Sequence, residues 1–552
     1  MSLDLSLEKD YRIVSDKPNV AEVELNENVE LRHQFSVWSL GSLCLCLMAT
    51  WEALSTVVAT ALTNGGAPCL FYNYIITFLA TIAVACSLGE IASMYPTAGG
   101  QYHWVALLSP SRSSKAASWF TGWISCGGQI VLSASAAFAA ALQLQALITL
   151  NNPDSYIPKR WQGMLFYWVV LAYSLAVNLW GSKLLPLTNM VSGVVHIVAF
   201  LTIVVVLGIM APKHDASYVF TEHSNTSGWS NDGVSWLVGL LSTVYPFLGY
   251  DSATHLAEEM VHPARDVPIA MVGSVIVNGI MGLGYCVILL FSIGDLDQLL
   301  LSPTGFPFMQ LFLNVTKSKA GASILSLTVT FIAIAANAAG LTSTSRTAWA
   351  FARDGAIPFS GYLAHVDKRY VVPTRMIVCI SVIQMLLGFL YLGSSTAFNA
   401  VLSMAILGMY ASYILPIIYM ILYGRKLGSH RPGPFTLGTI GGMVINVIAI
   451  AWLVFAMVFS AFPNSQPVTS NRLPSSLPTA AGLFLSFDAS TGDVKPLGPS
   501  SPHLFSTLSN LANPPCIRDG ELCLESCFGW RLKSSQDQDN PFGDGGTWHH
   551  SG

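Results

Sequence analysis

The stretch that decides the fold is VYPFLGYDSATHLAEEMVHPARDVPI, from Val244 to Ile269. It begins inside an apolar run and places Pro246, Gly249 and Asp251 close together. Proline removes a backbone donor and glycine loosens the backbone, so we expect a helix to break here near the middle of a membrane. Broken membrane helices with an acid beside the break form solute sites in transporters. The alternative is a kinked helix in which Asp251 only caps the second half.

The composition is that of a membrane protein. Of the 552 residues, 52% are hydrophobic and 10% are charged, whereas a soluble domain carries about 25% charged residues. The net charge of −4 argues against binding to nucleic acid, which requires clustered Lys and Arg on a water-facing surface. Cys516, Cys523 and Cys527 lack a CxxC pair and nearby histidines, so we expect no metal site there and no cofactor.

Apolar runs long enough to cross a bilayer recur along the chain, since a spanning helix requires roughly 20 apolar residues. Together they predict an all-α polytopic membrane protein of about eleven spans. We expect three parts: a disordered cytoplasmic tail at residues 1–36, a transporter domain at residues 37–462, and a low-complexity tail at residues 463–552. The runs lie at Trp38–Thr60, Tyr72–Met94, Trp119–Leu147, Met164–Leu179, Leu185–Met210, Val234–Met260, Ile269–Ser292, Ala322–Phe351, Met376–Gly393, Phe398–Tyr423 and Ile440–Phe462.

The positive charges predict a cytoplasmic N-terminus, because cytoplasmic connections carry an excess of Lys and Arg. The connections after odd-numbered spans are poorer, and the glycosylation sequons at Asn225 and Asn314 lie in two of them. With an odd number of spans, the C-terminal tail would lie outside. The connections after even-numbered spans hold Arg112, Lys115, Lys183, Arg265, Arg353, Lys368, Arg369, Arg375, Arg425, Lys426 and Arg431.

Four motifs along the chain point to a family in combination. They are Thr50-Trp51-Glu52 with TNGGAP at residues 63–68; SLGEIASMYPTAGGQYHWVALLSP at residues 87–110; GYDSATHLAEE with HPARDVP in the opening stretch; and SRTAWAFARDGAIP at residues 345–358. Together they resemble the fungal amino acid and choline permeases, including those of the γ-aminobutyrate (GABA) type, of the amino acid–polyamine–organocation (APC) superfamily.

This resemblance implies a leucine-transporter-type fold. Spans one to five and six to ten would form inverted repeats, spans one and six would unwind around the solute, and two further helices would flank the core. The family norm is twelve spans with both termini in the cytoplasm. No run after Phe462 supplies a twelfth span, so the C-terminal tail is either divergent or aberrant.

The break in span six is expected to form half of a substrate site. The N–H groups that open its second half favour a carboxylate, and the carbonyls from Tyr245 to Gly249 suit an ammonium. Phe247 and Tyr250 are expected to wall the pocket and to contact a cation through their ring faces. Asp251 stands beside them as a candidate substrate ligand.

The other half is expected at Thr50, Trp51 and Glu52 in span one. Glu52 lies well inside an apolar run, where a charge costs at least roughly 2.5–3.5 kcal/mol and requires a partner, a proton or a water-filled cavity. We expect Glu52 to carry the coupled proton or to pair with a substrate amine; a structural hydrogen bond to a neighbouring helix is the alternative. No glycine pair interrupts this span, so carboxylate binding by Thr50 and Trp51 rests on the resemblance.

Other polar residues inside the spans receive weaker interpretations. Gln129 in span three and Asn337 in span eight are expected to line the cavity, with hydrogen bonds between helices as the alternative. His196 in span five is interpreted as a packing histidine in preference to a proton relay, and His255 as bonded within span six.

Charged residues predicted at the cytoplasmic face form a candidate inner gate. They are Glu258 and Glu259 after the break in span six, and Arg346 and Arg353 at the end of span eight. Opposite charges on two elements can close a passage and release it. The alternative is that the basic residues only extend to the membrane interface.

These features predict a permease that imports an amino acid, GABA, choline or a polyamine by alternating access, coupled to protons. We expect it in the plasma membrane, with the vacuolar membrane as the other location. A potential of 100 mV supplies about 2.3 kcal/mol per charge, which makes uphill uptake feasible. Two alternatives stay open: a nutrient-sensing receptor with this fold, and a non-functional product that lacks the last helix. No P-loop, nucleophile elbow or metal-ligand cluster supports an enzyme.

Overall fold

The computed structural model describes residues 35–181, 185–367, 369–393, 397–425 and 432–466, together with four two-residue strands. The chain divides into a large unit, Met1–Gly482, and a small unit, Leu483–Gly552. Nearly all of the tail predicted at residues 1–36 and most of the tail predicted after Phe462 therefore lie outside the described residues. So do the following residues on which expectations were placed: Lys183, Lys368, Lys426, Arg431, Cys516, Cys523 and Cys527.

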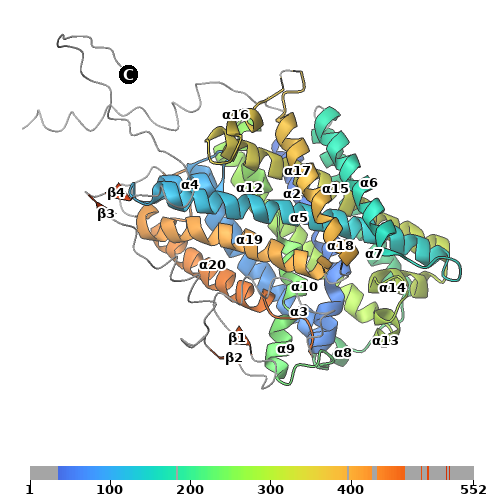
Figure 1. The fold of residues 1–552 in the computed structure, drawn as a ribbon. Helices are drawn as coiled ribbons and strands as arrows, with labels where there is room; N and C mark the ends of the chain where they lie inside the picture. Colours follow the sequence, from blue (N-terminus) through green and yellow to red (C-terminus); the bar gives the residue numbers. More distant parts are fainter. Residues whose placement is uncertain are drawn as a thin grey trace, which may run out of the picture. The chain divides into compact units, whose positions relative to one another are not determined.

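The described elements of the large unit are helical (Figure 1). In the small unit, β1 (Ser486–Phe487) pairs with β2 (Val494–Lys495), and β3 (Ile517–Arg518) pairs with β4 (Glu521–Leu522), both antiparallel. The helices are α2 (Val37–Met48), α3 (Thr50–Met94), α4 (Gln101–Leu108), α5 (Ser114–Asn151), α6 (Arg160–Trp180), α7 (Leu185–Met210), α8 (Ala216–Phe220), α9 (Asp232–Val238), α10 (Leu241–Val244), η1 (Tyr245–Phe247), α11 (Ser252–His255), η2 (Ala257–Glu259), α12 (Pro263–Ser292), α13 (Leu296–Leu300), α14 (Pro307–Thr316), α15 (Lys319–Arg353), α16 (Ser360–Leu363), α17 (Thr374–Leu387), α18 (Phe389–Gly393), α19 (Ala397–Tyr419), η3 (Met420–Gly424) and α20 (Thr439–Ser460).

Ten helical segments among the described residues are long and apolar enough to cross a membrane. The first of them, Val37–Met94, has 58 residues and would measure about 87 Å as one helix, roughly twice the thickness of a bilayer. Its backbone leaves the helical region at Gly66, where φ is 75° and ψ is −163°, a conformation open to glycine. Two spans therefore meet at Gly66, which makes eleven spans among the described residues. The prediction of an all-α polytopic membrane protein is confirmed.

Several helices begin where the sequence provides a local signal. The Ser36 side chain accepts a hydrogen bond from the Ser39 N–H and caps α2, and Ser318 caps α15 in the same way. Such caps satisfy N–H groups that have no partner within the helix. Pro263 occupies the first position of α12, where its missing N–H costs nothing. The HPARDVP motif is thus the turn into span seven.

Spans one and six are both interrupted, as the inverted repeat requires. In span one, Ala49 adopts a left-handed conformation (φ 42°, ψ 48°) between α2 and α3. In span six, Gly249 (φ 103°) lies in the extended segment between η1 and α11. The break in span six lies where proline and glycine predict it. The break in span one has no glycine and falls directly before Thr50.

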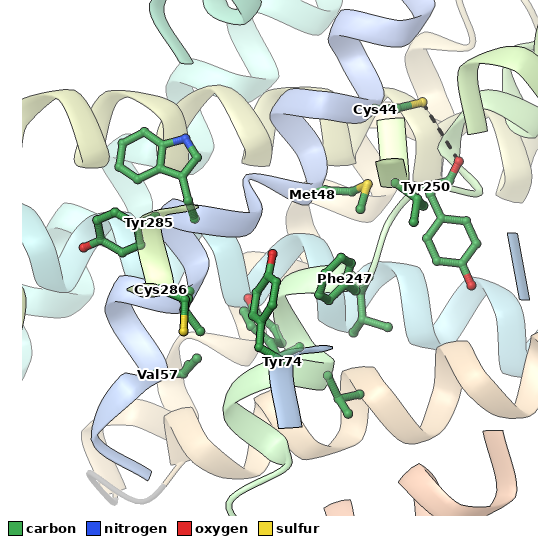
Figure 2. Close-up of a cluster of buried hydrophobic side chains, with 14 of the residues drawn as sticks. Cys44, Met48, Val57, Tyr74, Phe247, Tyr250, Tyr285 and Cys286 are labelled. Carbon is green, nitrogen blue, oxygen red and sulfur yellow. Dashed lines mark hydrogen bonds between the residues drawn. The ribbon is translucent and has the colours of Figure 1, made fainter. Parts of the chain in front are cut away.

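The two breaks contact each other, which explains how the membrane tolerates them. The Thr50 hydroxyl donates to the Pro246 carbonyl over 2.8 Å, so a carbonyl freed by one break is satisfied by the other span. Cys44 Sγ lies 4.0 Å from the Tyr250 carbonyl oxygen, the contact drawn in Figure 2. A Cβ on Gly249 would lie 3.0 Å from the Leu47 side chain, so the two backbones approach closely.

Span eleven ends at the same end of the bundle as the connection between spans five and six. The Trp229 indole N–H donates to the Pro463 carbonyl over 3.2 Å, and the Gln466 N–H donates to the Ser227 carbonyl over 2.8 Å. Residues directly after α20 therefore rest on the connection that precedes α9. Both segments lie on the predicted outer side.

The helices α5 and α19 run side by side (Figure 1) and cross where both carry glycine. A Cβ on Gly128 would lie 2.9 Å from the backbone carbonyl carbon of Gly408, so any larger residue there must separate the helices. At Gly127, its neighbour, a Cβ would have no atom of the described residues within 4 Å, so this position offers a matched control.

We expect Gly128→Ala to lower the free energy of unfolding by about 1–3 kcal/mol, because overpacking forces α5 and α19 apart. Gly127→Ala makes the same gain in helix propensity without the clash and should leave stability unchanged or higher. The thermal unfolding midpoints of both variants, purified in the same detergent, measure the difference. Equal midpoints would show that the crossing is not tight.

Candidate functional site

A cavity of about 40 Å³ lies at the two helix breaks. Spans one, three, six and eight supply its walls, which are mostly Ala, Leu and Met side chains. Among these apolar residues stand four polar ones: Glu52, Thr56, Gln143 and Tyr245. A largely apolar wall with a few convergent polar groups is the pattern of small-molecule sites. The volume exceeds the roughly 10–15 Å³ that one water molecule requires.

Glu52 forms a buried pair with His196 of span five. Glu52 Oε1 lies 2.7 Å from His196 Nδ1, and the two side chains are only 2% and 0% exposed. Neither Glu52 Oε2 nor His196 Nε2 has a hydrogen-bond partner among the described residues. A contact this short is a hydrogen bond, which forms when the Nδ1–H of His196 donates to the Glu52 carboxylate. The second carboxylate oxygen of Glu52 therefore remains without a partner among the described residues at the edge of the cavity.

Aromatic rings fix the position of His196. The Trp51 ring lies 5.9 Å from the His196 ring and 5.4 Å from the Tyr285 ring, measured between centroids. The Ser55 hydroxyl donates to the Tyr285 hydroxyl over 2.7 Å. Trp51 thus packs against the Glu52–His196 pair and does not line the cavity described above. The Thr50 hydroxyl is bonded to the Pro246 carbonyl of span six.

Asp251 lies in a separate buried polar cluster. Its Oδ1 accepts from the Tyr413 hydroxyl over 2.7 Å, and its Oδ2 accepts from Gln101 Nε2 over 2.8 Å. His255 Nε2 lies 3.3 Å from Oδ2 and 2.7 Å from Gln129 Nε2. The carboxylate is therefore held by side chains from two other parts of the chain and by His255, four residues later in the same span.

The rest of this cluster joins span six to spans two, three and eight. His255 Nδ1 lies 3.0 Å from the Ala98 carbonyl, and the Thr347 hydroxyl donates to Gln129 Oε1 over 2.9 Å. A second cavity of about 10 Å³ touches Gln129, Gly249 and Asp251. It has room for about one water molecule. The expected cavity residue Gln129 thus lines this smaller cavity.

The two aromatic residues expected to wall the pocket point elsewhere. Phe247 stacks on Phe78 with ring centroids 5.9 Å apart and lies 5.3 Å from the Tyr74 ring; Figure 2 shows it beside Tyr74. The Tyr250 ring lies 5.5 Å from the Tyr413 ring. Neither lines the larger cavity, where Tyr245 and Leu248 represent span six.

Asn337 makes hydrogen bonds between helices. Its Nδ2 donates to the Ser133 carbonyl of α5 over 2.9 Å, and its Oδ1 accepts from the Ser174 hydroxyl of α6. It therefore ties α15 to two neighbouring helices, which is the alternative that the sequence left open, and it does not line either cavity at the breaks.

The four residues of the candidate gate meet as two ion pairs. Arg353 Nη1 and Nη2 donate to the two Glu258 oxygens over 2.9 and 3.0 Å, and these side chains are 39% and 26% exposed. Arg346 Nε donates to Glu259 Oε1 over 2.9 Å, and both side chains are buried. Both pairs join η2 to α15. Both pairs lie at the predicted cytoplasmic end.

Sequence reasoning missed Gln143 as a cavity residue and did not predict the contact between His196 and Glu52. Gln143 lies about four helical turns after Gln129 on the same helix, so the spacing from Gln129 already placed it on the cavity face. No comparable signal was available for His196, because its partner lies four spans earlier and only the fold brings the two together.

The sequence was compared with known proteins. A family model described as amino acid permease matches residues 35–484. A choline transporter of Saccharomyces cerevisiae is 32% identical over 474 residues, covering 85% of this chain and 83% of that protein. Amino-acid permease BAT1 of Arabidopsis thaliana is 28% identical, covering 85% and 93%, and amino-acid permease 2 of Neurospora crassa is 29% identical, covering 80% and 81%.

The two ion pairs should differ strongly in their contribution to stability. Arg346→Gln leaves the Glu259 carboxylate buried and unpaired, which we expect to lower the free energy of unfolding by about 3–5 kcal/mol. Arg353→Gln removes a partly exposed pair and should cost about 0–1 kcal/mol. Unfolding midpoints of the two variants in one detergent check this. Similar midpoints for both would contradict the burial of the Arg346 pair.

Proposed function

This chain belongs to the amino acid permease family, and from that premise we propose that it is a secondary active transporter. It imports an amino acid or a small amine across the plasma membrane by alternating access, coupled to protons. The observation that carries this proposal is the Glu52–His196 pair, buried at a cavity between two helix breaks. The similarity to a choline transporter and to amino-acid permeases supports the substrate class.

The helix ends at the cavity suit a substrate that carries both charges. The end of α2 presents carbonyls with partial negative charge, and the start of α3 presents N–H groups with partial positive charge. No side chain caps the start of α3, so its first N–H groups remain available to a carboxylate. The free Oε2 of Glu52 lies on the cavity wall and is an acceptor for a substrate ammonium.

Charge balance connects the proton to the substrate. When it takes up one proton beyond the ring N–H of a neutral His196, the Glu52–His196 pair is neutral overall, and a zwitterionic amino acid is neutral too. A site of low dielectric constant disfavours net charge, so the zwitterion and the proton load together. Without the proton the pair carries one negative charge, which suits a permanent cation such as choline. Proton coupling is therefore expected for zwitterions and weaker for permanent cations.

Polar contacts at the predicted cytoplasmic end would control when the cavity opens to that side. The pairs Glu258–Arg353 and Glu259–Arg346 and the Asp251 cluster all join the inner half of span six to other spans. These polar contacts must separate for the cavity to open inward. Because each can form again, they act as a reversible inner gate.

Substitution of the proton-holding pair tests the coupling. In a transport-deficient host, we expect Glu52→Gln and His196→Gln to lower accumulation of a labelled amino acid at least tenfold. Parent uptake should rise as external pH falls and collapse with a protonophore, because the proton enters with the substrate. Asp154→Asn changes an exposed acid and should behave as the parent. Accumulation by Glu52→Gln with parental pH dependence would refute the proposal.

Asp251 gives a contrasting expectation because its carboxylate contacts the gate cluster. We expect Asp251→Asn to change the maximal rate of uptake severalfold while KM stays within about twofold, since the substrate cavity is lined by other residues. Initial rates over a range of substrate concentrations, corrected for protein at the membrane, separate the two constants. A tenfold rise in KM with an unchanged maximal rate would instead make Asp251 a substrate ligand.

A further inference from the structure

Gln143 is the one residue of α5 whose carboxamide is buried at the cavity without a partner among the described residues. Its side chain is 0% exposed and lines the larger cavity. Neither its Nε2 nor its Oε1 has a hydrogen-bond partner in that part of the chain. A buried polar group without a partner is destabilising, so this arrangement calls for a ligand.

The other two buried glutamines of the same helix are satisfied. Gln129 contacts His255 and Thr347. Gln145 Nε2 donates to the Tyr156 hydroxyl over 3.2 Å and to the Lys159 carbonyl over 3.1 Å. The side-chain amides of Gln129 and Gln145 therefore both have hydrogen-bond partners within the protein. Gln143 differs from both because it lines the larger cavity and its amide has no partner among the described residues.

The remaining polar groups of the cavity define what a ligand meets. The Tyr245 hydroxyl is bonded to the Ser135 hydroxyl over 2.7 Å, and the Thr56 hydroxyl donates to the Ala53 carbonyl over 2.7 Å. Of the four polar side chains on the wall, only those of Glu52 and Gln143 keep an atom without a partner among the described residues. A ligand thus meets one acceptor from Glu52 and one carboxamide from Gln143, with alanine and leucine side chains around them.

We propose that Gln143 determines specificity by hydrogen-bonding a hydroxyl or carboxylate group at the end of the substrate away from its cationic group. This inference rests on the proposed function, in which Glu52 receives the cationic group. A carboxamide provides two N–H donors and one carbonyl acceptor without a charge. It therefore binds a hydroxyl or a carboxylate and leaves the charge balance of the Glu52–His196 pair unchanged. The substrate class is a short organic cation or zwitterion with a second polar end.

Competition between matched compounds tests this assignment. Uptake of a labelled substrate of the parent is measured against unlabelled choline and ethyltrimethylammonium, which lacks the hydroxyl, and against GABA and butylamine, which lacks the carboxylate. In the parent, the compound with the second polar group should inhibit at a concentration at least about tenfold lower, since its loss leaves the Gln143 amide unpaired. This ratio does not depend on how much protein reaches the membrane.

Two substitutions and one control complete the test. Gln143→Met is similar in size without polar atoms and should reduce both ratios to within about twofold. Gln143→Glu adds a second acid and should weaken competition by GABA at least tenfold relative to choline. Gln145→Met removes a buried amide outside the cavity and should keep the parental ratios.

Parental ratios in Gln143→Met, or equal competition by GABA and choline in both the parent and Gln143→Glu, would overturn this inference alone. The proposed function fails in a different way. A parent protein that reaches the membrane but takes up no labelled amino acid, GABA or choline would overturn the proposed function and this inference together.

Discussion

Two interrupted helices inside a membrane are possible only where their freed backbone groups find partners within the protein. The contact between the Thr50 hydroxyl and the Pro246 carbonyl meets that requirement from one break to the other. Once spans one and six are joined in this way, spans three and eight close around them and leave the cavity. The helix ends that point into it are those that suit a charged solute.

A carboxylate buried away from water also requires partners within the protein, and the two buried acids at the breaks find different ones. Glu52 pairs with His196 at the cavity wall. Asp251 receives Tyr413 and Gln101, away from the larger cavity. The two acids were expected at equivalent breaks, but their side chains have different partners and different positions relative to the larger cavity. One pairs with a histidine at the cavity wall, and the other joins the inner half of span six to other parts of the chain.

The sequence predicted the fold class, the number of spans and the break in span six, because hydrophobic length and the Pro246–Gly249 pattern are local signals. The break at Ala49 carries no such signal, since a left-handed alanine is held by tertiary contacts. The four residues of the candidate gate meet as two ion pairs, and this pairing was not predicted. The rotation of a short helical turn decides whether Phe247 or Tyr245 faces the cavity, and sequence spacing does not determine it.

The central claim is that the Glu52–His196 pair carries the proton that drives uptake. Purified protein in proteoliposomes with a pH-sensitive dye inside tests it most directly, without the cell's own ion transport. We expect addition of a zwitterionic substrate outside to acidify the lumen with the parent protein, and we expect no acidification with Glu52→Gln/His196→Gln. Substrate-dependent acidification by the double variant equal to that of the parent would contradict the claim.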